Sequence, residues 1–171
     1  MRVRQTCLGL FLMGCALTAL SADDKKPLTD ETFVTKAAAD GMHEVELGKI
    51  AQMNAQSPAV KSFGKQMVDD HSKANEELKM IAGKAGIMVP SKAGDDKMKE
   101  LDKFKDLKGA DFDKAYMSHM VKDHEKAVAM FSKAAKDLKD PGLKGFAEKT
   151  LPTIQMHLKN AKAINDAFGK Q

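Results

Sequence analysis

The chain has 171 residues and a formal charge of +4, and its acidic and basic residues are both numerous. This length fits one domain. No basic cluster with interleaved aromatic residues is present, so we expect no nucleic-acid partner. The sequence also contains no Ser-His-Asp arrangement, phosphate-binding glycine loop or nucleotide fingerprint.

The first segment, residues 1–22, is typical of a secretory signal peptide. Arg2 and Arg4 precede an apolar run that ends at Leu20, small residues follow, and charge returns at Asp23. The run is shorter than the roughly 20 residues that a membrane-spanning helix needs. We therefore predict cleavage near Ala22 and a periplasmic or secreted mature chain without a transmembrane segment; a retained membrane anchor is the alternative.

The two cysteines, Cys7 and Cys15, both lie in this first segment. The mature chain, residues 23–171, is therefore expected to have neither disulfides nor cysteine metal ligands. Cys15 also loosely resembles a lipoprotein processing site, and a lipid anchor at this residue is a second alternative. Removal of Arg2 and Arg4 lowers the formal charge from +4 to +2, and the alternating charges that remain are typical of solvated helix surfaces.

The mature chain shows four long segments and one short segment with the period of amphipathic helices. Thr29, Ser57-Pro58 and Asp140-Pro141 are helix-start signals, because short polar side chains cap exposed N–H groups and proline suits the first helical position. Pro152 is expected to bend the last helix. The expected helices run from Thr29 or Asp30 to about Asn54, from Pro58 to between Gly83 and Gly86, from Asp95 to Leu107, from between Gly109 and Asp111 onward, and from Pro141 through Phe168.

The connections between these segments predict the topology. The first two helices are joined by about three residues, and the third and fourth long helices are also closely joined, so each pair is expected to be an antiparallel hairpin. A long connection that holds the short helix separates the pairs. Two hairpins with one long crossover predict an all-α, ferritin-like four-helix bundle, and a simple up-down-up-down bundle is the alternative.

An internal repeat supports this arrangement. Residues 67–74 match residues 120–127 at six of eight positions, with His71 and His124 at equivalent places. A motif shared by the two halves of a bundle produces such an offset, although chance similarity between Lys/Asp-rich helices is the alternative. The repeat therefore draws attention to the two histidines.

Four polar residues lie within the apolar faces of the four long helices when these are drawn with about 100° per residue: Glu44, His71, His124 and His157. By contrast, His43 and His119 fall at or beyond the edges of these faces. At ~1.5 Å per residue, the four inward residues lie at similar depths, within about one helical turn in each hairpin. We therefore expect three imidazoles and a carboxylate to converge in the middle of the bundle.

Two chemical explanations fit this set. A buried carboxylate is unfavourable unless it is paired, hydrogen-bonded or bound to a metal. The four residues are therefore either the ligands of one transition-metal ion or a structural hydrogen-bond network. Imidazole and carboxylate suit zinc, iron, manganese, nickel and copper without choosing among them. Asp70 and Asp123, next to two of the histidines, are predicted to orient imidazoles as second-shell acceptors, and exposure on the surface is the alternative.

Ten methionines follow the predicted signal peptide, and Met67 and Met120 each precede a candidate histidine by four residues. Thioethers favour copper(I), but methionine is also an ordinary core residue. Both interpretations stay open.

Several short segments together resemble the bacterial exported family called "domain of unknown function 4142". The resemblance covers about residues 33–167, and it implies a ferritin-like bundle in the cell envelope and no established activity. Its segments are residues 44–49, 67–71, 109–113, Tyr116 with 120–124, and Leu151-Pro152 with His157-Leu158.

One departure limits what the ferritin-like resemblance implies. Ferritin-like di-iron proteins carry Glu-x-x-His motifs, whereas Val68, Val121 and Ile154 stand three residues before the histidines. Ferroxidase or oxygenase chemistry is therefore not expected here.

The sequence thus supports three functional hypotheses. The first is an exported helical protein that binds one transition-metal ion in its core. The second is a non-catalytic envelope stress or interaction protein whose buried His/Glu set is structural. The third is a metal-dependent oxidoreductase, which is disfavoured because four protein ligands would close a tetrahedral site. No protein partner or oligomeric state is assigned.

Overall fold

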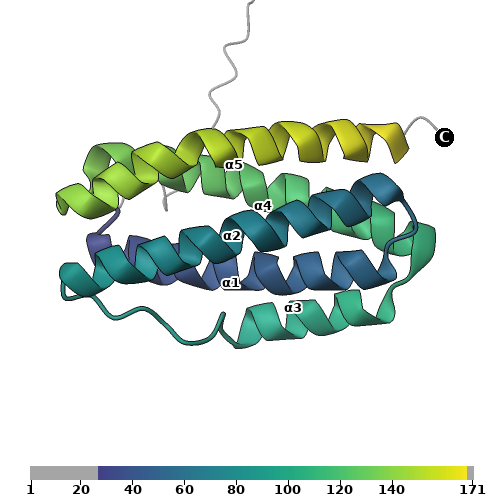
Figure 1. Cartoon of the computed structure of the whole chain (residues 1–171), viewed down its shortest axis with the longest axis horizontal. Helices are drawn as coiled ribbons and strands as arrows, with labels where there is room; N and C mark the ends of the chain where they lie inside the picture. The colour runs from purple at the N-terminus through teal and green to yellow at the C-terminus, as the bar shows by residue number, and fades with distance from the viewer. Residues whose placement is uncertain (1–26, 169–171) are drawn as a thin grey trace, which may run out of the picture.

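The structure of the protein is a computed structural model that describes residues 27–168. This part of the chain forms five α-helices and no strand (Figure 1). The predicted signal peptide and Cys15 lie outside the described residues. The helices are α1 (Asp30–Asn54), α2 (Pro58–Lys84), α3 (Asp95–Asp106), α4 (Gly109–Asp137) and α5 (Pro141–Phe168).

Side-chain hydrogen bonds cap the starts of α1 and α5, whereas the starts of α2, α3 and α4 have no side-chain cap. The Thr29 hydroxyl accepts from the Thr32 N–H at 3.2 Å, and the Asp140 carboxylate accepts from the Leu143 N–H at 2.9 Å; each satisfies an exposed donor of the first turn. Ser57 occupies the cap position of α2, but its side chain makes no capping hydrogen bond. The buried Asp113 carboxylate of α4 instead accepts from the Ser57 N–H at 2.8 Å, which ties the α1–α2 turn to α4.

The four long helices lie side by side, and their chain directions are clear in Figure 1. α1 packs along α2 and α4 packs along α5, each pair as an antiparallel hairpin, while α3 packs against α1. The connection after α2 and α3 itself together return along the length of the molecule, so α2 and α4 run in the same direction (Figure 1). Each long helix therefore contributes its midpoint to one central level of the molecule.

Two glycines bring α1 and α2 close together. A Cβ atom at Gly48 would lie 2.5 Å from the Gly64 carbonyl oxygen, and a Cβ at Gly64 would lie 2.7 Å from the Ala51 Cβ. Any larger side chain would push the two helix backbones apart. This close contact fixes α1, including Glu44 one turn before Gly48, against α2.

The apolar core is divided into two clusters along the helix axes. One cluster includes Leu47, Phe63 and Met120, and the other includes Phe33 and Phe131. On every long helix the candidate polar residue lies in sequence between the two: between residues 38 and 47, 67 and 78, 120 and 131, and 154 and 161. A polar layer therefore separates two apolar layers in the interior.

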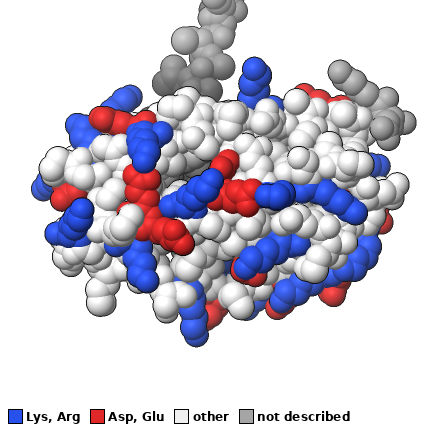
Figure 2. Space-filling view, in the orientation of Figure 1, with Lys and Arg blue, Asp and Glu red and all other residues white. Residues whose placement is uncertain are grey.

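The surface carries charges of both signs. Figure 2 shows basic and acidic side chains interspersed over the visible face, without a field of one sign. Within residues 27–168, no helix is both long and apolar enough to cross a lipid bilayer.

Candidate metal centre

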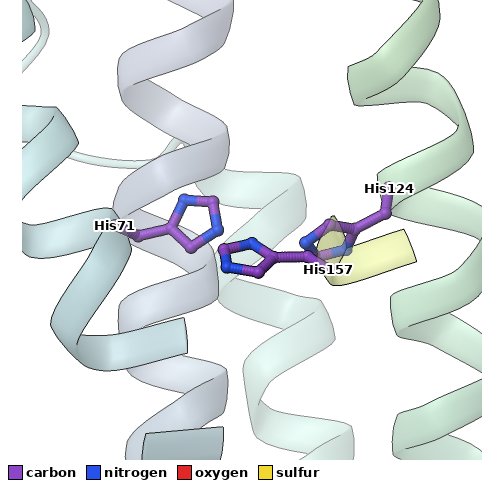
Figure 3. Close-up of side chains that lie close together, drawn as sticks. All are labelled: His71, His124 and His157. Carbon is purple, nitrogen blue, oxygen red and sulfur yellow. The ribbon is translucent and has the colours of Figure 1, made fainter. Parts of the chain in front are cut away.

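Three histidines from three helices meet in the polar layer. His71 of α2, His124 of α4 and His157 of α5 point toward one another (Figure 3). Their ring centroids are 5.5–6.0 Å apart, and one ring nitrogen from each lies within 4.8 Å of the other two. We call these residues the tri-histidine cluster.

Glu44 of α1 adjoins this cluster. Its Oε2 atom lies 2.8 Å from the His71 Nε2 atom, and its Oε1 atom lies 3.6 Å from the His124 Nδ1 atom. The Glu44 side chain is only 7% exposed, so these imidazoles replace the water that a carboxylate otherwise needs. The four residues named from the sequence are thus brought together, one from each long helix.

Fixed acceptors set the tautomers of two imidazoles. The His124 Nδ1–H donates to the Met120 carbonyl oxygen at 2.9 Å, one turn earlier on α4. The His157 Nε2–H donates to the Asp70 carboxylate at 2.9 Å. A carbonyl or ionised carboxylate only accepts, so the proton of each neutral ring sits on the bonded nitrogen and the other nitrogen keeps its lone pair.

The opposite ring nitrogens have no hydrogen-bond partner. These atoms are the His124 Nε2 and the His157 Nδ1, and the His71 Nε2 is likewise buried without hydrogen-bond geometry toward any acceptor, despite its short contact with Glu44. A buried polar atom without a partner loses about 1–3 kcal/mol of solvation free energy. The lone pairs of His124 Nε2 and His157 Nδ1 therefore call for a group that accepts them, and His71 Nε2 offers a third once its proton is lost.

The protonation equilibria of Glu44, His71 and His157 differ. Burial alone would raise the pKa of Glu44, but the charges of His71 and His124 outweigh it and bring the pKa to about 2. Burial alone would lower the pKa of His71, but the Glu44 carboxylate raises it above the ordinary value. Burial and the neighbouring imidazoles lower the pKa of His157 to about 4. At neutral pH, His157 is therefore uncharged and able to act as a ligand, whereas a cation must compete with a proton at His71.

The cluster has access to solvent. An open cavity of about 840 Å³ is lined by residues of α1, α2, α4 and α5, including Glu44, His71 and His157. On the opposite, apolar side, the Phe63 ring lies 6.2 Å from the His124 ring and 6.5 Å from the His157 ring, between centroids. An ion therefore has a polar route in and an apolar wall behind it.

The two predicted orienting aspartates have different surroundings. Asp70 contacts His157 across the α2–α5 interface instead of its sequence neighbour His71. Asp123 turns away from its neighbour His124, and its Oδ2 atom lies 3.0 Å from the His119 Nε2 atom. Asp70 is thus placed to orient a ring of the tri-histidine cluster, whereas Asp123 contacts His119, which lies outside this cluster. Their roles toward a metal stay predictions.

The expectation for His43 is wrong. The sequence placed it at or beyond the edge of the buried face of the first helix, but its side chain is fully buried. The reason is that α3 packs against this side of α1 and brings Glu100 to within 3.2 Å of the His43 Nε2 atom. The spacing of His119 and Asp123, four residues apart on one helix face, was the available signal for this second group.

Structural comparison finds proteins with the same fold. CopM in its Cu(II)-bound form superposes with a TM-score of 0.71 at 18% identity, over 84% of this chain and 99% of CopM. CopM in its Cu(I)-bound form gives a TM-score of 0.69 at 18% identity, over 82% and 98%. A DUF305 protein from Streptomyces coelicolor gives 0.68 at 14% identity, over 80% and 91%. At such low identity the likeness shows a shared helical fold.

Sequence comparison shows the family. No curated protein has a significantly similar sequence. The family model for a domain of unknown function, DUF4142, matches residues 16–164, which is most of the chain. This match confirms the resemblance noted in the sequence, and the chain therefore belongs to the DUF4142 family.

Proposed function

We propose that this protein binds one transition-metal ion through the tri-histidine cluster, with the Glu44 carboxylate as the adjoining anionic ligand. The observation that carries the proposal is the set of three buried ring nitrogens without hydrogen-bond partners: His71 Nε2, His124 Nε2 and His157 Nδ1. Two of them have lone pairs fixed by acceptors on the far side of the ring. Outer hydrogen bonds of this kind are the usual way in which proteins orient metal-binding imidazoles.

The electrostatics support a cation at this place. Glu44 is ionised at neutral pH, since its pKa is about 2, and it supplies a negative charge beside the imidazoles. Because the cavity reaches Glu44, His71 and His157, exchange of the ion does not require the bundle to open. The same cavity leaves room for water or a small ligand beside the ion.

Copper is the first metal to test. Imidazole and carboxylate donors accommodate Cu(II) and also zinc, nickel and iron. The solved CopM structures, which share this fold, are described as Cu(II)- and Cu(I)-bound forms. Met67 and Met120 are fully buried one turn before His71 and His124, so thioethers suited to Cu(I) lie on the same helices.

The test is metal analysis of protein purified without added metal and after equilibration with Cu(II) or Zn(II). Wild-type protein is expected to retain one more ion per chain than a His71→Ala, His124→Ala double variant. The Glu77–Lys149 surface pair, 2.8 Å long and outside the cluster, offers a matched control: Glu77→Ala is expected to bind as wild type does. Equal and negligible metal in wild type and double variant would end the proposal.

A structural hydrogen-bond network is the second candidate function of this set. It is favoured by the contacts of Glu44 with both His71 and His124, which pair the carboxylate without any metal. A non-catalytic stress or interaction protein built this way keeps the same thermal stability with and without a chelator. A metal-binding protein loses stability on chelation, so one melting experiment separates the two. A metal-dependent oxidoreductase would need turnover in addition to binding.

We further propose that the mature protein is a ferritin-like bundle of residues 23–171 exported from the cytoplasm. The two antiparallel hairpins joined by a long crossover support the topology, and the DUF305 protein of the same fold is described as secreted. Mass spectrometry of the mature protein tests the export step. A chain that starts after Ala22 supports signal cleavage, whereas an intact Met1 or a lipidated Cys15 contradicts it.

A further inference from the structure

The two histidines outside the tri-histidine cluster form a second group. All five histidines of the chain therefore fall into two groups. In the second, the Glu100 carboxylate of α3 bridges the two rings, with Oε2 at 3.2 Å from the His43 Nε2 atom and Oε1 at 3.4 Å from the His119 Nδ1 atom. The Asp123 Oδ2 atom lies 3.0 Å from the His119 Nε2 atom. We call His43, Glu100, His119 and Asp123 the flank cluster.

His43 is the most unusual member of the flank cluster. Its side chain is 0% exposed, and neither of its ring nitrogens has a hydrogen-bond partner. The His119 Nε2 atom is also buried without a hydrogen bond. An imidazole buried in this way loses the solvation of its ring nitrogens without compensation. The flank cluster therefore resembles the tri-histidine cluster in having buried ring nitrogens without hydrogen-bond partners.

The spacing of these atoms suits a metal ion. Ligand atoms from His43, His119 and Asp123 all lie within 4.8 Å of one another. Nitrogen and oxygen ligands about 2.0–2.2 Å from an ion are separated by roughly 3.3–3.6 Å in a tetrahedral site. The contact of 3.0 Å between His119 Nε2 and Asp123 Oδ2 and the contact of 3.2 Å between His43 Nε2 and Glu100 Oε2 are close to this separation. Small side-chain shifts would therefore bring one nitrogen of each ring and an Asp123 oxygen around one ion.

Two lysines near the flank cluster, Lys97 and Lys126, are already paired with carboxylates. Lys126 lies 3.2 Å from the Oδ1 atom of Asp123, which leaves the Oδ2 atom turned to His119. Lys97 of α3 lies 2.6 Å from the Asp40 carboxylate. A separate cavity of about 300 Å³ between α3 and α4 is lined by Glu100, Phe104 and His119 among others. A cation thus reaches the cluster from solvent without passing through the first site.

We propose that the flank cluster is a second metal site, which binds a divalent first-row transition-metal ion through the imidazoles of His43 and His119 and the carboxylate of Asp123, with the Glu100 carboxylate adjoining it. Two imidazoles and one carboxylate, with a second carboxylate beside them, are a harder donor set than the first site offers, and they suit Zn(II), Ni(II), Mn(II) or Fe(II). The ion would join α3 to α1 and α4. This inference is independent of the function proposed for the tri-histidine cluster.

Zinc stoichiometry tests the inference. The probe is Zn(II), measured by equilibrium dialysis of the purified protein followed by metal quantification. Wild type is expected to bind two ions per chain, and a His119→Gln, Asp123→Asn double variant is expected to bind one. A His71→Ala, His124→Ala variant is also expected to bind one, and the combination of all four substitutions none.

A pair of variants on α3 gives the finer test, since neither side chain is fully buried. Glu100→Gln removes one carboxylate of the flank cluster and is expected to weaken the second zinc ion about tenfold. Asp102→Asn changes a 70% exposed carboxylate that pairs only with Lys105, and it is expected to leave zinc binding unchanged. Circular dichroism shows whether each variant folds, and Glu100→Gln carries the test if the double variant does not.

Each stoichiometry decides the matter. Equal zinc binding by wild type and by the His119→Gln, Asp123→Asn variant overturns the inference. A single zinc ion in wild type that is lost only in the His71→Ala, His124→Ala variant overturns it as well. A single zinc ion in wild type that is lost in the His119→Gln, Asp123→Asn variant supports the flank site and contradicts metal binding by the tri-histidine cluster. Zinc is also expected to slow amide hydrogen exchange in α3 of wild type but not of Glu100→Gln, and no slowing in wild type contradicts the role of Glu100.

Discussion

The tri-histidine cluster and the flank cluster use similar residues in different surroundings. In the first, two imidazoles share the Glu44 carboxylate and the third contacts Asp70. His124 and His157 are almost completely buried between two apolar layers. In the second, two imidazoles share two carboxylates, and Glu100 is 38% exposed at the crossover helix. The first is therefore built by the four long helices, whereas the second exists only where α3 covers α1.

Both clusters depend on one turn of α1. His43 and Glu44 are consecutive and therefore point about 100° apart around the helix, so each faces a different cluster. His119 and Asp123 on α4 face the flank cluster, and His124, next in sequence, faces the other. A covering helix such as α3 buries a second face of α1. Adjacent residues of one helix can therefore belong to two separate sites.

The largest expected effect comes from His157→Leu in the tri-histidine cluster. Wild-type protein gains about 2.7 kcal/mol of unfolding free energy when the metal concentration is 100 times the dissociation constant. The variant is expected to lose most of this gain, because one of three imidazoles is gone. Its metal-free form is expected to be about 1 kcal/mol more stable than wild type, since an unsatisfied buried nitrogen is removed. Denaturant unfolding with and without metal measures both; a metal-free variant less stable than wild type would favour the structural network.

The next effect concerns pH and Glu44. The folded pKa of Glu44, about 2, is below its ordinary 4.5, so its stabilisation is present above pH 4.5 and lost as the pH falls toward 2. The pKa of His71 is raised above 6.5, so its contribution is present below 6.5 and lost as the pH rises through the raised value. The pair is therefore expected to stabilise the metal-free protein most between pH 4.5 and 6.5.

Glu44→Gln isolates this pH dependence from that of all other groups. The measured quantity is the difference in unfolding free energy between wild type and variant, obtained by denaturant titration at several pH values. A maximum between pH 4.5 and 6.5 is the expected result. A difference that is constant from pH 2 to 8 contradicts the ion pair between Glu44 and the tri-histidine cluster.

A smaller effect is expected from Gly48→Ala. This variant tests which of the two clusters depends on the close packing of α1 against α2. The new Cβ would lie 2.5 Å from the Gly64 carbonyl oxygen, and we expect about 2 kcal/mol of destabilisation from the forced helix shift. Metal affinity should fall more at the tri-histidine cluster, which needs α1 against α2, than at the flank cluster. Gly83→Ala is the matched control, because its Cβ meets nothing within 4 Å; equal stability changes in both variants would argue against the close contact.

The smallest expected effect is that of Asp70→Ala. Without the acceptor at 2.9 Å, the His157 ring is free to change its tautomer, and we expect roughly tenfold weaker metal binding. Asp69→Ala is the matched control, since Asp69 pairs with Lys65 at the surface. Calorimetric titration compares the two. Equal metal affinities of the two variants would show that Asp70 does not orient His157 for metal binding.

Much of the fold was predictable because its signals are local. Thr29, Pro58 and Pro141 mark helix starts, and α1, α2, α4 and α5 begin within the predicted positions. The all-helical class and the family are confirmed. The Ser57 side chain does not make the expected capping hydrogen bond. The turn before α2 is instead held by the carboxylate of Asp113, a distant residue on α4, which accepts from the Ser57 N–H.

The candidate sites were predictable only in part. Glu44, His71, His124 and His157 stand within apolar stripes, and a helical wheel is sufficient to bring them to one level. His43 lies outside its stripe and is buried by α3, whose position depends on tertiary packing that no single-helix pattern records. Asp123 was assigned by its neighbour His124, although adjacent helical residues face different directions, and it contacts His119 instead.

The central claim is that three ring nitrogens of the tri-histidine cluster hold one ion. Anomalous X-ray diffraction from crystals of the copper- or zinc-equilibrated protein tests it most directly. We expect a peak roughly 2.0–2.1 Å from the His71 Nε2, His124 Nε2 and His157 Nδ1 atoms. A map from metal-equilibrated crystals without a peak among these three nitrogens would contradict the account.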